Sequence, residues 1–363
     1  MKKSRKHYRF LLLMVCLVSL LGCNRTRIID KISIVHLFGF DQSDNGELIG
    51  TVLSPEYTKS KASDQIQYLS EQGETSALIV PKMEAYSNTP IEIAKIRVLI
   101  IGNRYAKAGI RNMVDRFVIT PQLGTNIQIV ASTHTAKETL NAFKKEKSLT
   151  LAEQLEHNMQ GQNLPNMNLH YFLNHFYGAG MDPYVPMLAI DENEKLKIEG
   201  LGIFKDDQLK LRLNPEQSIL FSILKDYRSE ATLKMDLDQK NSKEIITVRA
   251  FRSKSHWDWN QKKKQLNLRL RLEWTLMQYP NRYNLEKDKD VREMKNMIVE
   301  KLEKEIRDLL ALFKENEVDP LGLGNIVRSQ DRTWKEEAFY QQYPEMPINV
   351  NINLQIIHTG LED

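Results

Sequence analysis

The stretch LNLRLRLEWTL, residues 266–276, alternates apolar and polar side chains from Leu266 to Trp274. The stretch INVNINLQII, residues 348–357, alternates in the same way, with only asparagine and glutamine at its polar positions. This period of two predicts two β-strands, each with one buried face. Residues 287–315, between them, repeat apolar side chains at spacings of three and four and are nearly all charged elsewhere, which predicts a long amphipathic helix.

The uncharged polar face of residues 348–357 has two interpretations. A sheet with one solvated face produces this pattern. A face that docks on a partner produces the same pattern, so the sequence leaves both open.

Working outward, the N-terminal part also carries strand signals. Residues 32–41 and 47–53 predict a hairpin, with a turn between them and Pro55 ending the second strand. The β-branched run at 93–101 predicts a buried strand, and residues 126–132 predict another. Residues 56–76 are polar and predict a loop or a partly helical segment.

Helices are predicted between these strands. One helix follows the 93–101 strand, with a single apolar stripe, and two capping boxes, Thr135–Glu138 and Thr150–Glu153, predict the starts of two more. The apolar stripe comprises Ala106, Ile110, Met113, Val114 and Phe117. Residues 160–196 are rich in Gly, Pro and aromatic side chains and are the candidate domain junction. Strands alternating with helices predict a mixed α/β (α+β) fold.

The second half begins with another predicted hairpin. Residues 198–204 and 208–213 are its strands, with Lys205, Asp206 and Asp207 as the turn. Asn214-Pro215 predicts a helix start, with Asn as N-cap and Pro at the first helical position. Residues 244–251 predict a further strand.

The N-terminus reads as an export leader. Residues 2–9 are basic and polar, and residues 10–21 form one apolar run, which is too short to span a bilayer comfortably. The run ends in Leu20-Leu21-Gly22-Cys23, which resembles a bacterial lipobox. This resemblance implies that residues 1–22 are removed and that Cys23 carries an S-diacylglyceryl group and an N-acyl group. The alternative is an uncleaved signal anchor with an incidental Cys23.

Charge and cysteine content exclude several classes of protein. The net charge of +4 comes from the leader, because without residues 1–22 the 363-residue chain keeps 46 basic and 47 acidic side chains. A nucleic-acid partner is therefore not expected, since such proteins carry excess positive charge on the folded body. Cys16 and Cys23 are the two cysteines, so no disulfide framework or cysteine-based zinc site is expected.

Catalytic motifs are not apparent in the sequence. It contains no G-x-S-x-G elbow, no H-E-x-x-H pair and no Walker loop. His170 and His175 lie in an aromatic stretch and are expected to be structural. His256 and Trp257, in the run HWDW, are compatible with a ligand platform but favour a packing role near a strand end. Gly322-Leu323-Gly324 follows a helix and lacks the third glycine of a dinucleotide fingerprint. We therefore expect no enzyme activity, metal or cofactor.

Several segments, in this order, resemble the Ger(x)C family of spore germination lipoproteins. They are Phe38–Asp41 (FGFD), Thr51–Pro55 (TVLSP), residues 96–110 (IRVLIIGNRYAKAGI), Gly200–Asp206 (GLGIFKD), Asp319–Gly324 (DPLGLG), Trp334-Lys335, Tyr343-Pro344 and Gly360. The chain departs from the family pattern at Val118–Pro121, where the family often has Arg-Asp, and at Lys210, where it often has Gly.

The resemblance implies a function and a location. It implies three small α/β domains, in an N-terminal region (residues 23–195) and a C-terminal region (residues 196–363). It implies the C subunit of a nutrient germinant receptor, joined to membrane-spanning A and B subunits on the outer face of the spore inner membrane. It implies no catalytic residue. The alternative is a free-standing substrate- or carbohydrate-binding lipoprotein of the cell envelope, with its cleft near the 160–196 junction or at His256-Trp257.

Overall fold

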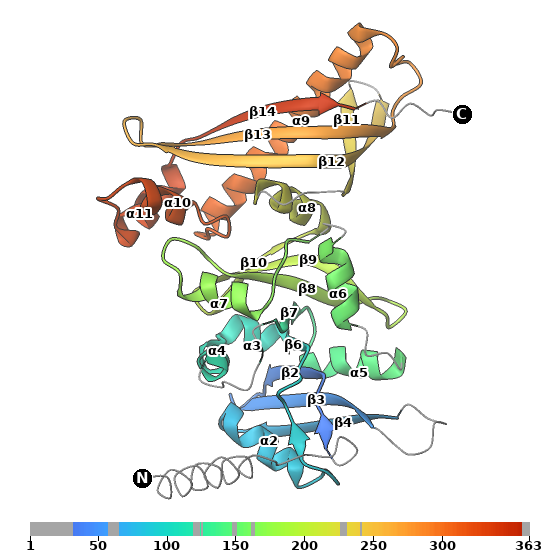
Figure 1. The fold of residues 1–363 in the computed structure, drawn as a ribbon, viewed down its shortest axis with the longest axis vertical. Helices are drawn as coiled ribbons and strands as arrows, with labels where there is room; N and C mark the ends of the chain where they lie inside the picture. The colour runs from blue at the N-terminus through green and yellow to red at the C-terminus, as the bar shows by residue number, and fades with distance from the viewer. Residues whose placement is uncertain are drawn as a thin grey trace, which may run out of the picture.

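The structure is a computed structural model of an elongated molecule with two main β-sheets (Figure 1). It describes residues 32–56, 65–118, 124, 126–146, 151–160, 164–225, 231–239 and 242–357. The predicted leader and Cys23 lie outside these residues, as does Thr150. The larger sheet begins near one end of the long axis, with β2–β4, and the smaller sheet, β11–β14, occupies the other end.

The larger sheet has eight strands and mixed polarity. Its order is β10 (Gln208–Leu213), β9 (Leu196–Lys205), β8 (Tyr184–Ile190), β7 (Gln128–Ser132), β6 (Val98–Ile101), β2 (Leu37–Gln42), β3 (Leu48–Glu56) and β4 (Gln65–Gly73). The four middle strands run parallel, and an antiparallel pair of strands extends the sheet on each side. A two-stranded parallel sheet, β1 (Ser33–Ile34) with β5 (Ile91–Glu92), lies beside it.

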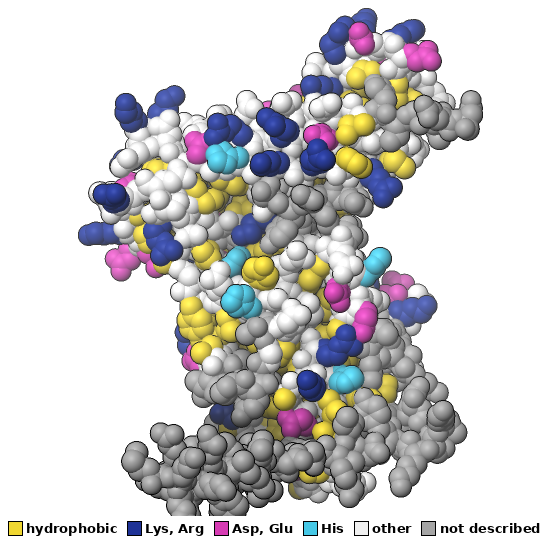
Figure 2. Space-filling view, viewed as in Figure 1, with side chains coloured by type: hydrophobic (Ala, Val, Ile, Leu, Met, Phe, Trp, Pro, Cys, Tyr) yellow, Lys and Arg dark blue, Asp and Glu magenta, His cyan; other side chains and the backbone are white. Residues whose placement is uncertain are grey.

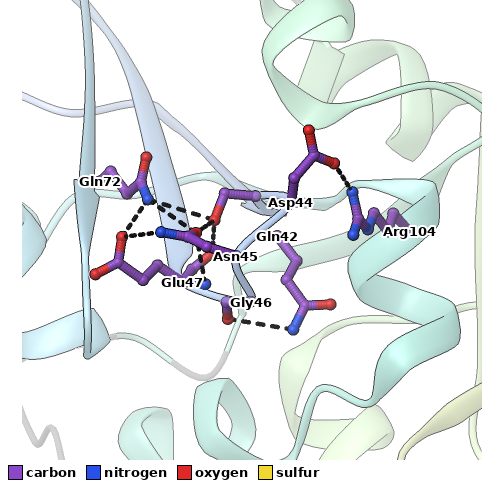
Figure 3. Close-up of polar contacts among 8 residues, drawn as sticks. Gln42, Asp44, Asn45, Gly46, Glu47, Gln72 and Arg104 are labelled. Carbon is purple, nitrogen blue, oxygen red and sulfur yellow. Dashed lines mark hydrogen bonds and ion pairs between the residues drawn. The ribbon is translucent and has the colours of Figure 1, made fainter.

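The β2–β3 hairpin confirms the first predicted turn. Gly46 has φ +86°, and the turn is held by side chains from three elements (Figure 3). The Asn45 side chain donates to Glu47 at 2.9 Å, and Gln72 of β4 also donates to Glu47. Arg104 pairs with Asp44 from the other side of the turn. The turn therefore ties β2–β3 to the next strand of the sheet, through Gln72, and to Arg104.

Two expectations near this hairpin are wrong. Within the range 56–76, Gln65–Gly73 are not a loop or helix but form edge strand β4, paired with β3 along its whole length. Strand β3 also continues past Pro55 to Glu56. Proline is tolerated there because the pairing of β3 with β2 ends at Leu53, so Pro55 pairs only with β4.

Helices cover the large sheet, and one predicted helix is divided in two. They are α2 (Ser76–Glu84), α3 (Asn103–Ala108), α4 (Arg111–Val118), α5 (Ala136–Glu146), α6 (Leu151–Gln160) and α7 (Leu169–Tyr177). The predicted single helix breaks between α3 and α4, because the Ile110 N–H donates to the Asp207 carbonyl at 3.0 Å instead of continuing the helix. Residues 160–196 are more regular than expected, since they contain α7 and strand β8.

Helix α5 begins with the predicted capping box. The Thr135 N–H donates to Glu138 at 2.9 Å, and the Glu138 N–H donates to the Thr135 hydroxyl at 3.0 Å. The Asp41 carboxylate, at the end of β2, accepts the next two N–H groups, from Ala136 and Lys137, at 2.8 and 2.9 Å. The aspartate of the FGFD segment thus fixes α5 against the central strands.

The second predicted hairpin and helix start are also confirmed. Strands β9 and β10 pair antiparallel around a turn in which Asp206 has φ +53°. Helix α8 (Pro215–Leu224) begins with a capping box in which Asn214 and Gln217 each accept the other's backbone N–H, at 2.8 and 3.0 Å. The predicted division after residue 195 lies in the turn between β8 and β9, and the domain division stays a prediction.

The smaller sheet has the order β11 (Thr232–Gln239), β12 (Ser242–Asn260), β13 (Gln265–Gln278) and β14 (Ile348–Ile356). Strands β13 and β14 pair in parallel without a register shift. The predicted long helix is α9 (Asp288–Glu315), which packs against β14 and β11 with its apolar stripe buried. Helices α10 (Leu323–Gln330) and α11 (Glu336–Gln342) follow it. The predicted mixed α/β fold is confirmed.

Candidate functional site

Two buried aspartates join the large sheet to the C-terminal part of the molecule. Asp182 precedes β8 of the large sheet, and Asp319 follows α9 of the C-terminal part. The Asp182 N–H donates to the Asp319 carbonyl at 2.9 Å, and the Asp319 N–H donates to the Asp182 carboxylate at 2.6 Å. Their residue exposures are 4% and 0%. We call this reciprocal pair the aspartate clasp.

The Asp319 carboxylate also holds the start of α10. It accepts the N–H groups of Leu323 and Gly324 at 2.9 and 2.7 Å. These are orphan donors of the first helical turn, so the carboxylate acts as a cap. The DPLGLG segment therefore has a structural role, because its aspartate fixes the start of α10. Its glycines follow a helix, whereas those of a dinucleotide-binding fingerprint follow a strand.

Two lysines face the clasp. Lys205 lies with its Nζ 3.3 Å from both Asp182 carboxylate oxygens and 3.6 Å from the centre of the Tyr340 ring. Lys225 donates to the Leu321 carbonyl at 3.4 Å. Burial raises the pKa of Asp319 to about 7 and lowers the pKa of Lys225 to about 8. Burial also raises the pKa of Asp182, which the Lys205 charge opposes.

A close backbone approach completes the junction. Gly180 has φ +72°, and its carbonyl accepts the Asn325 N–H at 2.8 Å while its N–H donates to Glu336 at 2.9 Å. A Cβ on Gly180 would lie 2.6 Å from the carbonyl carbon of Gly324. The loop before β8 and the start of α10 therefore touch main chain to main chain.

A cleft of about 360 Å³ opens beside the clasp. Its charged lining consists of Asp182, Lys205, Asp206 and Glu336, with Tyr177 and Tyr340 as aromatic walls. Asp182 and Lys205 pair with each other, and Glu336 accepts the Gly180 N–H. The contacts described for these three groups are structural, and their geometry indicates a rigid joint.

The two histidines of α7 do not form a site together. His170 is exposed, whereas His175 is buried edge-on against the Tyr184 ring, with centroids 5.2 Å apart. Burial lowers the pKa of His175 to about 4, so it is neutral at pH 7. The structural interpretation of His175 is confirmed.

The HWDW run does not form a single platform. It lies within β12, which is longer than predicted, and its side chains alternate between the two faces of the sheet. His256 is exposed on the outer face, whereas the Trp257 indole N–H donates to the Leu224 carbonyl of α8 at 3.1 Å. The ligand-platform interpretation of His256-Trp257 is therefore wrong, because successive strand residues point in opposite directions.

The outer face of β12–β14 carries ordered rows of polar side chains. The strand register forms one row from Lys254, Arg271 and Asn353 and a second row from His256, Arg269 and Asn351. We call this surface the Arg–Asn face; it comprises Lys254, His256, Arg269, Arg271, Asn349, Asn351 and Asn353. Two hollows, of about 440 and 360 Å³, lie along it. Figure 2 shows Lys and Arg side chains gathered over these strands.

Within the described residues, no cluster of His, Cys, Asp or Glu is suited to hold a metal ion. Among the same residues, no helix is long and apolar enough to cross a bilayer. The lipidation predicted at Cys23 lies outside them and stays a prediction.

Sequence reasoning missed the aspartate clasp as a site. Asp182 and Asp319 are 137 positions apart, and neither lies in a motif with a known ligand chemistry. The available signals were the tight Gly-rich segments around each, at Gly178–Gly180 and Gly322–Gly324. They mark close backbone approach but do not pair the two segments.

Comparison with known proteins agrees with the family resemblance. A family described as the spore germination protein N-terminal domain matches residues 25–190. A second, described as spore germination B3/GerAC like, C-terminal, matches residues 199–360. Together they cover nearly the whole chain.

The chain is also similar to individual proteins. The chain is 24% identical over 359 residues to spore germination protein GerQC of Bacillus cereus, covering 98% of this chain and 99% of that protein. It is 21% identical over 264 residues to the putative spore germination protein YfkR of Bacillus subtilis (strain 168), covering 71% and 67% of the two chains. The crystal structure of the GerBC protein shares the fold, with a TM-score of 0.59 at 13% identity, over 88% of this chain and 97% of that one. The chain therefore belongs to the Ger(x)C family of spore germination proteins.

Proposed function

We propose that this protein is the lipoprotein C subunit of a nutrient germinant receptor, needed for nutrient-triggered spore germination. The observation that carries the proposal is the end-to-end match to GerQC, a spore germination protein, together with the lipobox-like ending at Leu20–Cys23. Its partners are the membrane-spanning A and B subunits, on the outer face of the spore inner membrane. The proposal assigns no reaction and no cofactor to this chain.

The acyl anchor at Cys23 limits how far the folded body can lie from the membrane. Two acyl chains give stable membrane anchoring, because each buried CH₂ contributes about 0.8 kcal/mol. The ten residues from Cys23 to Ser33 reach at most about 35 Å when fully extended. The end of the molecule with β2–β4 therefore stays within reach of the membrane, and β11–β14 lie at the opposite end of the long axis (Figure 1). Tethering raises the effective concentration of the body at the membrane subunits.

The rigid joint fits a subunit that holds a fixed orientation. The aspartate clasp, the Lys205 ion pair and the Gly180 contact tie the large sheet to the C-terminal helices. A partner that contacts the C-terminal part is then held at a defined place relative to the anchor.

Lipidation and assembly are tested together in spores. The protein is labelled with an alkyne fatty acid and isolated from spore membranes, and the A and B subunits encoded beside it are sought by mass spectrometry. We expect label and both subunits with wild type and with Cys16→Ala, whose cysteine lies in the discarded leader. Cys23→Ala is expected to lose the label. Label that persists in Cys23→Ala, or wild type isolated without either subunit, would contradict the proposal.

A further inference from the structure

Two features of the Arg–Asn face are unfavourable for the stability of the sheet that carries it. Lys254 and Arg271 lie directly opposite each other on β12 and β13. Like charges at opposed positions destabilise a strand pair. Asn349, Asn351 and Asn353 occupy successive outward positions of β14, although asparagine is depleted in strands. A face selected only for solvent contact has no need of either feature.

The cations of this face are unevenly neutralised. Asp258 accepts from Asn267 and pairs with Arg269 at 3.0 Å, and Glu273 pairs with Arg252 at 3.3 Å. Asp258 and Glu273 lie in the two outermost rows, on either side of the rows that contain His256 and Lys254. Within the described part of the chain, Lys254 and Arg271 have no acidic partner, so positive charge is left in the middle of the face.

The chemistry of the face fits carboxylates presented by an extended chain. The Arg271 guanidinium is exposed. A guanidinium can hold a carboxylate through two parallel hydrogen bonds. The neighbouring Asn353 and Asn351 amides both donate and accept, as backbone peptide groups require. The two hollows follow one another along β13 and β14, sharing Arg269 and Asn351, so together they form a continuous track.

The position of the face favours a protein over a lipid surface. In the fold, β11–β14 lie at the opposite end from β2–β4, the end near the predicted anchor (Figure 1). The rows from Asp258 to Glu273 present polar side chains, and binding to a bilayer interface needs apolar insertion in addition to charge. Strand β14 is the last strand of its sheet among the described residues, so the track is open at one side to a large partner.

We propose that the Arg–Asn face is a docking surface for an extended acidic segment of a partner protein, with Arg271 and Lys254 binding its carboxylates. This inference deepens the proposed function, on which it rests, by naming the surface and the chemistry of the partner.

The test uses the full-length protein in spores, with a photo-crosslinking amino acid in place of Asn351. The test variant is Lys254→Glu/Arg271→Glu, which reverses the charge of the central row and keeps a like-charged pair across β12 and β13. The control is Lys107→Glu/Lys210→Glu, an identical charge change at exposed positions of α3 and β10. Circular dichroism of each purified variant establishes that it is folded.

We expect a crosslink to a protein segment in which Asp and Glu outnumber Lys and Arg. The product should fall at least tenfold in the test variant and remain in the control. A crosslink to phospholipid or glycan, no product in wild type, or an equal yield in the test variant would overturn the inference. If wild type co-isolates the A and B subunits but the test variant crosslinks unchanged, the inference fails and the proposed function stands. A crosslink to an acidic protein without co-isolation of those subunits would contradict the proposed function and leave the docking surface supported.

Discussion

Gly180→Ala tests whether main-chain contact joins the large sheet to the C-terminal part of the molecule. Gly180 has φ +72°, and an added Cβ would lie 2.6 and 2.7 Å from two backbone atoms of Gly324 and Asn325. A side chain could rotate away from such a clash, but main chain cannot. Either the loop before β8 or the start of α10 must move, which disturbs the bond between Gly180 and Asn325.

The magnitude follows from two separate costs. A left-handed backbone conformation costs an alanine about 1–2 kcal/mol. Overpacking a tight contact costs about 1–3 kcal/mol more. Gly46→Ala is the matched control, because Gly46 has φ +86° and nothing within 4 Å of an added Cβ. We therefore expect Gly46→Ala to lower the free energy of unfolding by the conformational cost alone. Gly180→Ala should lower it by the conformational cost and the overpacking cost together.

The assay is denaturant unfolding of the purified protein, followed by tryptophan fluorescence and circular dichroism in parallel. The difference between the two variants isolates the contact between the loop and α10. Equal loss of unfolding free energy in Gly180→Ala and Gly46→Ala would refute the reasoning, since backbone strain alone would then account for both.

Further substitutions test the other contacts, with unfolding free energy from denaturation as the measurement. Asn214→Ala should lose about 1 kcal/mol, because it removes the cap of α8. Asp319→Asn should lose about 2 kcal/mol, because an amide cannot accept both N–H groups at the start of α10. The raised pKa of Asp319 means that the folded state keeps a proton that the unfolded state releases, so stability should fall as pH rises from about 4 to about 7. Asp319→Asn should flatten that slope, and an unchanged slope would contradict the assignment. Arg271→Glu should gain about 0.2–1 kcal/mol by placing opposite charges across from Lys254, while the crosslink from the Arg–Asn face weakens.

The elements that the sequence predicts best are those with one uniform face. Strands β13 and β14 and helix α9 alternate or repeat cleanly because each packs one side on a single core. The capped starts of α5 and α8 were equally visible, since a cap is a local arrangement of a few residues.

Strand β4 and the second half of β12, which the sequence did not predict, lack a uniformly apolar face. From Ile66 to Gln72, every side chain of β4 is only half-buried, so no apolar period develops. The second half of β12 points Ser253 and Ser255 inward, where the Ser255 hydroxyl donates to the Leu224 carbonyl at 2.9 Å. Buried hydroxyls with backbone partners satisfy the interior without any hydrophobic signal.

The candidate sites were only partly predictable. The alternation of β14 left docking open as an interpretation of its polar face, but the opposition of Lys254 and Arg271 depends on the register between β12 and β13. The aspartate clasp joins positions 137 residues apart and became visible only in the fold. Tertiary pairing of this kind leaves no pattern in a single sequence.

The most direct test of the central claim is nutrient-triggered germination of purified spores that lack this protein, with each nutrient supplied separately. We expect the response to one nutrient class to be lost. We also expect the intact gene to restore the response fully and Cys23→Ala to restore it only weakly. Full restoration by Cys23→Ala, or unchanged germination with every nutrient in spores that also lack the parallel receptors, would contradict the proposed function.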